Sequence, residues 1–317
     1  MIRGYALENG ALVALPRAGA GAVWLDLAQP GEDERALAED LAGLPLPRAE
    51  EMEEIEISSR LYARGETAVM TAILPARTED AQPVMAPVSF VLTPDRLVTV
   101  RHHAPRAFET FPDRATRGDM AFDGAGDVTV SLLEAVVDRL ADILERLGGE
   151  IDTISRGVFS SEATVSRDFQ DVLERIGRKG ELASNIRDSL VTLDRLARFL
   201  GQVLARRSAG KDLRERTKTL SRDIRSLLDH AGFLSQKITF LLDATLGMIS
   251  IEQNAIIKIF SVAAVMFLPP TLIASIYGMN FQHMPELGLP FGYPMALGAM
   301  VVSAILPYLY FRRRGWL

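Results

Sequence analysis

Two long uncharged stretches near the C-terminus constrain the fold of this chain most strongly. Residues 259–277 form a run of 19 residues and residues 287–311 a run of 25, and neither contains Asp, Glu, Lys or Arg. A helix rises about 1.5 Å per residue, so each run is long enough to cross the roughly 30 Å hydrocarbon core of a bilayer. Helices this long without a polar face are rare in soluble cores, so the sequence predicts two transmembrane helices.

The ends of the two runs predict how the chain crosses the membrane. The connector between them, residues 278–286, is so short that the helices must form a hairpin. It carries no Lys or Arg, whereas Lys258 precedes the first run and Arg312, Arg313 and Arg314 follow the second. Basic residues favour the cytoplasmic side, so both termini are predicted to be cytoplasmic. Two helices per chain cannot enclose a water-filled pore, so a conducting protein must be a homo-oligomer.

The rest of the chain is strongly charged and is predicted to be a cytoplasmic body. Its N-terminus has no uninterrupted apolar run of signal-peptide length, so we expect that the body is not exported. The 317 residues include no cysteine, which excludes disulfides, thiolate zinc sites and a cysteine nucleophile. The net charge of -6 gives no reason to expect nucleic acid as a partner. Neither a phosphate-binding loop nor a metalloprotease His pair occurs, so we expect neither an enzyme nor an organic cofactor.

Hydrophobic periodicity divides the chain into segments. Short apolar runs alternate with turn signals at first, with a helix expected over residues 32–44, one apolar run over residues 61–74 and a hairpin over residues 88–101. The pattern then becomes helical, with weak points at residues 159–163 and 208–210, and a continuous helix over 211–277 would be roughly 100 Å long. The predicted segments are a cytoplasmic α/β domain (1–125), a cytoplasmic helical stalk (126–254), a first transmembrane helix (255–277), a periplasmic loop (278–290), a second transmembrane helix (291–311) and a basic tail (312–317).

A polar stripe follows the first membrane helix. Residues at heptad spacing share one helical face, and most polar residues of this span fall on it. The stripe predicts a pore lining of Asn254, Ile257, Ser261, Ala264, Leu268, Thr271 and Ser275. It contains no carboxylate, which suits a divalent cation that keeps its water shell, as magnesium does. Ser261 and Ser275 fit ordinary helix packing equally well.

The first membrane helix also contains two prolines and two apolar residues on its polar stripe. Pro269 and Pro270 lie within the span, and proline removes a backbone donor, so a kink or loosening is expected near Phe267 and Leu268. A fixed bend and a gating hinge are both compatible with that expectation. Apolar residues on the stripe, Ile257 and Leu268, suit gating by dewetting.

Three short motifs surround the connector. They are Tyr-Gly-Met-Asn at residues 277–280, Met-Pro-Glu-Leu at residues 284–287 and Arg-Gly-Trp-Leu at residues 314–317. In a C-terminal hairpin with a basic end, they resemble the CorA family of magnesium transporters, whose hallmark is Gly-Met-Asn at the outer end of the first membrane helix. The resemblance implies a CorA-like funnel: an α/β N-terminal cytoplasmic domain, long stalk helices and two C-terminal transmembrane helices.

The resemblance also implies roles for particular residues. It assigns the selectivity filter to Gly278, Met279 and Asn280, with the oxygens of Gly278 and Asn280 holding Mg²⁺ through its hydration shell. It adds Phe260 to the pore lining, one position away from the heptad pattern. Ile257 and Leu268 stand where some relatives carry methionine, so which apolar ring forms the gate stays open.

The same resemblance implies which ions are transported and how transport is regulated. It implies a pentamer in the bacterial inner membrane that admits Mg²⁺, and also Co²⁺ and Ni²⁺, down the electrochemical gradient. Acidic groups between cytoplasmic domains would bind regulatory Mg²⁺ and hold the channel closed. Residues 32–56 carry ten acids against two arginines, and residues 198–225 nine bases against three acids. Both runs fit solvated helix faces, and which acids would bind regulatory Mg²⁺ stays open.

Further polar residues have two interpretations. Glu286 either concentrates cations at the outer entrance or is a solvated loop residue. His283 is expected to be an exposed loop residue rather than a zinc ligand, because no second ligand is near it in the sequence. His102 and His103, at a strand end, are expected to be structural.

Two alternative functions fit the same features. A zinc transporter of the related ZntB branch also carries Gly-Met-Asn, although the Met-Pro-Glu-Leu sequence favours CorA. A membrane-anchored tether or sensor that conducts nothing would explain the long charged helix.

Overall fold

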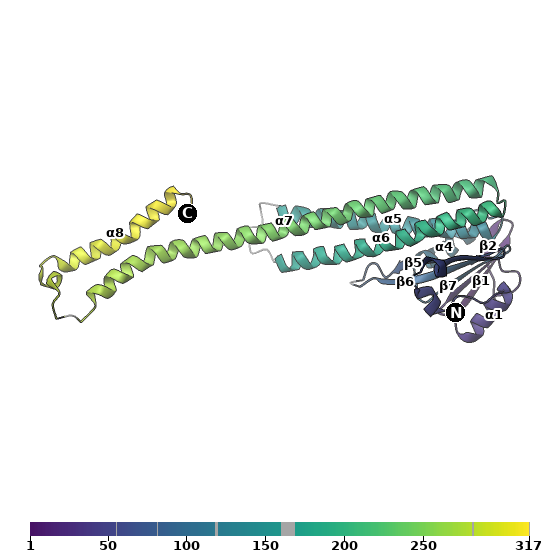
Figure 1. Ribbon diagram of the computed structural model, residues 1–317, viewed down its shortest axis with the longest axis horizontal. Coiled ribbons are helices and arrows are strands. Elements are labelled where there is room, and N and C mark those ends of the chain that lie inside the picture. The colour runs from purple at the N-terminus through teal and green to yellow at the C-terminus, as the bar shows by residue number, and fades with distance from the viewer. Residues whose placement is uncertain (55, 81, 118–119, 160–168, 281, 317) are drawn as a thin grey trace. The chain divides into compact units, whose positions relative to one another are not determined.

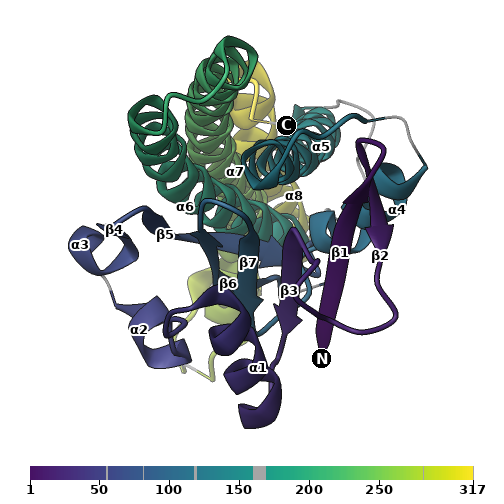
Figure 2. The ribbon, with the colours of Figure 1, turned by 90° about the vertical axis from the view of Figure 1, so that its right-hand side faces the viewer.

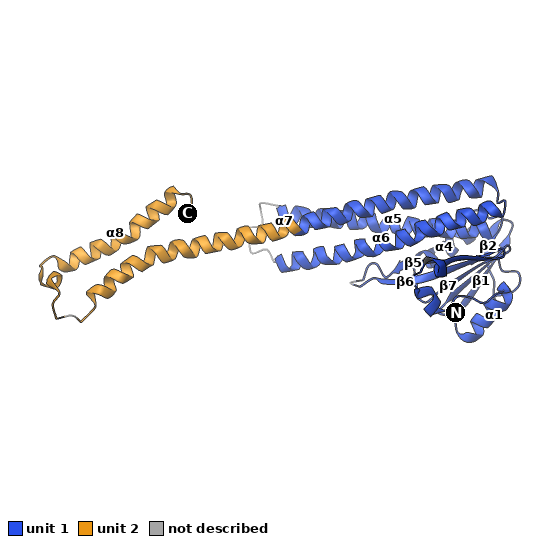
Figure 3. Cartoon of the chain, viewed as in Figure 1, with its two compact units in different colours: residues 1–242 blue, residues 243–317 orange. Residues whose placement is uncertain are grey.

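The computed structural model describes residues 1–317 except 55, 81, 118–119, 160–168, 281 and 317. The strands lie in the first third of the chain together with three short helices, and the described elements after them are helices (Figure 1). The chain divides into two compact units, Met1–Leu242 and Asp243–Leu317 (Figure 3).

A seven-stranded sheet forms the centre of the first unit. Its strand order is β2-β1-β3-β7-β6-β5-β4, with β3 parallel to β7 and every other neighbouring pair antiparallel. The strands are β1 (Ile2–Glu8), β2 (Ala11–Ala14), β3 (Trp24–Ala28), β4 (Leu61–Arg64), β5 (Thr67–Ala76), β6 (Val84–Leu92) and β7 (Leu97–Arg101).

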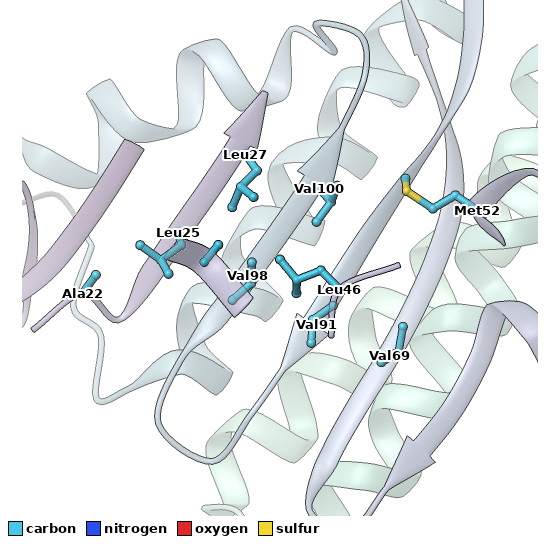
Figure 4. Close-up of a cluster of buried hydrophobic side chains, with 10 residues drawn as sticks. Ala22, Leu25, Leu27, Leu46, Met52, Val69, Val91, Val98 and Val100 are labelled. Atoms are coloured by element: carbon cyan, nitrogen blue, oxygen red, sulfur yellow. The ribbon is translucent and has the colours of Figure 1, made fainter. Parts of the chain in front are cut away.

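One face of the sheet is covered by short helices near the N-terminus. These are α1 (Glu32–Ala42), α2 (Ala49–Glu53) and α3 (Ile57–Arg60). Ala38 of α1 and Met52 of α2 pack with Leu27, Val69 and Val100 in a buried apolar cluster (Figure 4). Alternate residues of a strand point to one face, so these strand side chains form a continuous apolar surface there.

The opposite face carries α4 (Ala107–Thr116), α5 (Ala125–Phe159) and α6 (Phe169–Arg206) (Figure 2). The Trp24 ring contacts Phe111 edge to face, with ring centroids 5.6 Å apart. Hydrogen bonds fasten α6 to β5: the Ser189 hydroxyl donates to the Ile73 carbonyl at 2.6 Å, and the Ile73 amide donates to Thr192 Oγ1 at 3.0 Å. The sheet is therefore enclosed between two helical layers, as the predicted α/β domain requires.

Most predicted elements are present in this unit. The helix expected over residues 32–44 is α1, and the hairpin over residues 88–101 is β6–β7. The apolar run 61–74 is two strands rather than one, because the chain turns at Gly65, whose φ is +60°. An N-terminal hairpin, β1–β2, was not predicted; it turns at Asn9 and Gly10, both with positive φ, a pair typical of tight hairpins.

Three long helices follow the sheet. α5 ends at Phe159 and α6 at Arg206, and α7 runs without a break from Lys211 to Tyr277. The predicted break at 208–210 and the continuous 211–277 helix are therefore confirmed. The other predicted break begins at Phe159, and the rest of it lies outside the described residues.

The second unit contains the end of α7, a short 3-10 helix η1 (Pro285–Gly288) and α8 (Gly292–Arg313). Among the described residues, α7 and α8 are long and apolar enough to cross a membrane. α8 begins five residues after the start of the second uncharged run, and Gly292 at its start lies so close to η1 that a Cβ there would overlap the Glu286 carbonyl oxygen.

Candidate functional site

One face of α7 packs against α8 in the second unit. Val262 is 2% exposed, and Ala296 on α8 is 6% exposed. An apolar cavity of about 280 Å³ lies between the helices and is lined by Met266, Phe267 and Pro270 of α7 and by Met300, Val301 and Ala304 of α8. The hairpin therefore has a defined inner side, which includes Val262 and Met266.

The predicted pore-lining residues lie on the opposite side of α7. Nine residues correspond to roughly two and a half turns, so Ile257 and Ser275, each nine residues from Met266, point away from α8, as does Thr271 relative to Val262. All the predicted lining residues are exposed in the single chain: Asn254, Ile257, Phe260, Ser261, Ala264, Leu268, Thr271 and Ser275. They form one surface that α8 leaves uncovered. We call it the open face.

Hydroxyl groups on the open face differ in their partners. The Thr271 hydroxyl donates to the Phe267 carbonyl at 2.6 Å, as threonines within membrane helices often do, and keeps its oxygen lone pairs as acceptors. The hydroxyls of Ser261 and Ser275 and the amide of Asn254 make no hydrogen bond to any other described residue. The open face therefore presents neutral oxygens together with the apolar side chains of Ile257, Phe260 and Leu268.

Two prolines are accommodated within α7. The helix continues through Pro269 and Pro270 to Tyr277. Without N–H groups, these prolines leave the carbonyls of Val265 and Met266 without their usual helical donors. The predicted loosening of the backbone hydrogen bonds thus lies beside α8 and one turn from Leu268.

The predicted filter residues follow the end of α7. The amide of Gly278 donates to the Ala274 carbonyl at 2.9 Å and that of Met279 to the Ile276 carbonyl at 3.2 Å, so the backbone keeps a helical turn here. Gly278 has no positive φ, so its backbone conformation is one that other residues also adopt. A Cβ at this position would lie 3.2 Å from the Ala274 oxygen, so a larger residue here would require a small shift of that carbonyl.

The connector presents polar groups beyond the filter. Asn280 is exposed, Phe281 lies outside the described residues, and Glu286 is an exposed residue of η1. His283 is exposed, as expected of a loop residue. Across the described residues, no group of three or more His, Asp or Glu side chains is placed to hold a metal ion.

The side chain of His103 has a structural partner, whereas that of His102 is exposed. His103 Nε2 lies 2.9 Å from the Leu74 carbonyl, and the Arg101 guanidinium donates to the His103 carbonyl at 2.8 Å. Burial lowers the pKa of His103. The backbone carbonyl of His102 accepts a hydrogen bond from the Gln29 amide at 3.0 Å.

One contact at the other end of the hairpin was not predicted. The Lys258 ammonium lies 5.5 Å from the centroid of the Trp316 ring, and the Trp316 ring stacks on Phe311. The hairpin could have suggested it, because antiparallel helices of similar length bring the start of the first beside the end of the second. The contact connects the basic tail to α7 just before the first uncharged run.

Comparisons with known proteins identify the family and the fold. A family model described as "CorA-like Mg2+ transporter protein" matches residues 19–313. The magnesium transport protein CorA of Pasteurella multocida (strain Pm70) is 37% identical over 321 residues, covering 100% of both chains. The complete structure of the CorA magnesium transporter from Methanocaldococcus jannaschii aligns with a TM-score of 0.81 at 21% identity, covering 100% of this chain and 99% of that one.

A more distant comparison concerns the ZntB alternative. The ZntB cytoplasmic domain from Vibrio parahaemolyticus RIMD 2210633 aligns with a TM-score of 0.58 at 11% identity and covers 78% of this chain. At that identity the match indicates a shared fold only.

Proposed function

The chain belongs to the CorA-like Mg²⁺ transporter family, and we infer from this membership that it is a transporter of Mg²⁺. We further propose that copies of it surround a shared axis with their open faces inward and conduct Mg²⁺ into the cytoplasm. Five copies are expected, the number that the resemblance to the CorA family implies. The bacterial inner membrane is the expected location, with both termini cytoplasmic.

The observation that carries this proposal is the uncovered polar side of α7. α8 packs against the side that contains Val262 and Met266, while Asn254 and Thr271 remain exposed on the other side. Polar groups facing lipid would be costly, so a second copy or water must cover them. Copies arranged around an axis supply both neighbouring copies and water, because each open face then borders a water-filled conduit.

The chemistry of this surface supports a hydrated ion. The open face has hydroxyl and amide groups but no carboxylate, and Mg²⁺ gives up its water reluctantly. Neutral oxygens of Asn254, Thr271 and Asn280 would contact the water shell rather than the metal. A membrane potential, inside negative, favours entry of a divalent cation by about 4.6 kcal/mol per 100 mV. Apolar rings at Ile257 and Leu268 would close the conduit by dewetting.

Regulation by cytoplasmic Mg²⁺ is part of the proposal. Because no metal-holding group of three His, Asp or Glu side chains occurs among the described residues of one chain, a regulatory ion would bridge copies or be held through its water. Binding that favours the closed arrangement would lower conduction as internal Mg²⁺ rises.

The deciding experiment measures Mg²⁺ flux into liposomes that contain the purified chain. Asn280→Ala should abolish flux while the protein still inserts and assembles. Gln282→Ala is the matched control, since it removes another exposed amide two residues along the connector and should leave flux near the wild-type rate. Undiminished flux in Asn280→Ala would refute the filter assignment, and a wild-type protein that conducts no cation would favour a tether.

The absence of native cysteine allows a direct test of the open face. Asn254→Cys and Thr271→Cys should react with a membrane-impermeant thiol reagent in the assembled protein, whereas Met266→Cys, on the side against α8, should react slowly. Equal reactivity at the three positions would contradict the inward orientation. Proton-coupled Zn²⁺ flux exceeding Mg²⁺ flux in the same vesicles would favour the zinc alternative.

A further inference from the structure

A strongly basic groove lies in the first unit between the end of α6 and the start of α7. Its volume is about 910 Å³, and small residues, among them Gly201 and Ala205, contribute to its lining. Glu215 is the acid among its described lining residues. Six basic side chains also line it: Arg198, Lys211, Arg214, Lys218, Arg222 and Arg225. We call this feature the basic groove.

Half of these bases have no ion-pair partner among the residues that the structure describes. Arg198 and Arg225 share the Asp194 carboxylate, and Lys211 lies 3.8 Å from Glu215. The three that form no ion pair with any described residue are Arg214, Lys218 and Arg222. They are four residues apart along α7, and like charges at this spacing destabilise a helix. We call these three residues the ridge. An acidic partner bound to the ridge would remove the repulsion between its like charges.

The complementary charge is present elsewhere on the same chain. Residues 32–56 carry ten acids against two arginines, and we call them the acidic segment. Glu50, Glu53 and Glu54, in α2 and at its end, are exposed and form no ion pair with any described residue.

The basic groove and the acidic segment lie on opposite sides of the sheet. α1 and α2 pack on one face through Ala38 and Met52, whereas α6 is hydrogen-bonded to β5 from the other face through Ser189 (Figure 2). The sheet separates the two surfaces, so they do not meet within one chain. Their complementarity is available only to two different copies.

We propose that the basic groove of one copy binds the acidic segment of the next. This contact joins two different surfaces, so it is head-to-tail, and a head-to-tail contact closes into a ring when the rotation between copies allows it. Inward-facing α7 helices require copies arranged in a ring. The inference therefore rests on the proposed function, which supplies that ring. The Arg214, Lys218 and Arg222 ridge would then be neutralised by the neighbour's carboxylates.

Charge reversal and rescue test the contact in the full-length protein. Replacing the ridge (Arg214→Glu, Lys218→Glu, Arg222→Glu) should raise the concentration at which the oligomer dissociates by about tenfold or more at low salt. Reversal of the acidic segment (Glu50→Lys, Glu53→Lys, Glu54→Lys) should do the same. Combining both sets in one chain should restore assembly, measured by mass photometry in detergent. Restoration also shows that the substitutions do not unfold the chain.

The control replaces three exposed α6 bases outside the groove and changes net charge equally: Arg178→Glu, Arg187→Glu and Arg195→Glu. Assembly of this variant should match the wild type. Ridge reversal that leaves the oligomer unchanged, or a combined variant weaker than either set alone, would overturn the proposal. Inorganic polyphosphate that binds the wild type but not the ridge variant, with assembly unaffected, would also overturn it and identify a polyanion site.

Failure here is separable from failure of the transport proposal. Asn280→Ala should lose flux but still form the oligomer, because residue 280 lies outside the basic groove. Ridge reversal should instead lose the oligomer first, and flux only as a consequence.

Discussion

The Lys258 ammonium lies 5.5 Å from the centroid of the Trp316 ring, and this contact connects the two ends of the membrane hairpin. Trp316 also stacks on Phe311, with ring centroids 5.2 Å apart. A cation placed over an indole ring is stabilised by about 0.5 to 1 kcal/mol at exposed sites. The basic tail is therefore held against α7 rather than left free.

Loss of this contact should release the tail. In Trp316→Ala, trypsin should cleave at Arg312, Arg313 and Arg314 about two- to fivefold faster, the factor that 0.5 to 1 kcal/mol implies. Quantitative mass spectrometry of the C-terminal peptides measures the rate. Lys258→Met should accelerate cleavage similarly, and Trp316→Phe less. Wild-type cleavage in Lys258→Met would show that the ring stacks without the cation.

A buried ion pair holds β3 to β7. The Arg101 guanidinium donates to Asp26 at 2.8 Å, and the two residues are 4% and 1% exposed. Asp26→Asn should lower the free energy of unfolding by about 3 to 5 kcal/mol, because it leaves the Arg101 charge buried without a counterion. Thermal unfolding of the purified full-length chain measures the loss.

Glu174→Gln is the control for this substitution. Glu174 lies 3.7 Å from Arg178, and both side chains are exposed, so the change should cost less than about 0.5 kcal/mol. Equal effects of the two substitutions would mean that water reaches the Asp26 carboxylate.

Periodicity and charge predicted the long elements of this fold. An uninterrupted helical pattern predicted α7, and two uncharged runs predicted the hairpin, because each signal accumulates over many residues. The N-terminal hairpin was missed although Asn9-Gly10 signals one, and Gly65 divided a run that appeared continuous. Short strands give weak signals, since a few apolar residues fit one strand or two equally well.

The candidate site was predicted as a set of residues but not as a packed surface. Heptad spacing placed Asn254 and Thr271 on one face, yet only the packing of Met266 against α8 identifies which face stays uncovered. The Ala274 carbonyl lies close to Gly278, where a Cβ would be 3.2 Å from its oxygen, and a motif does not reveal such a contact.

Acid should weaken the first unit through His103. Burial lowers the pKa of this imidazole, so the folded state binds its proton less readily than the unfolded state does. Its contribution to stability is complete above the unfolded pKa of about 6.5 and is lost as pH falls from there toward the lower folded value. Wild type should therefore lose more stability than His103→Gln between about pH 7.5 and 5.5 in thermal unfolding.

The neighbouring histidine controls for this pH effect. His102→Gln should retain the wild-type loss of stability with acid, because the His102 side chain is exposed. An identical pH response of the wild type and His103→Gln would assign the acid sensitivity to other groups.

The start of α8 should tolerate no side chain at position 292. A Cβ on Gly292 would overlap the Glu286 carbonyl oxygen, whereas one on Gly298 in the same helix would meet open space. Gly292→Ala should therefore displace η1 and lower the free energy of unfolding by about 1 to 3 kcal/mol. Gly298→Ala should raise it by up to about 1 kcal/mol, because alanine favours a helix over glycine. Thermal unfolding distinguishes these opposite signs, and equal stability of the two variants would mean that the connector moves freely. Mg²⁺ flux should fall in Gly292→Ala alone, since η1 and the Asn280 side chain belong to the same short connector.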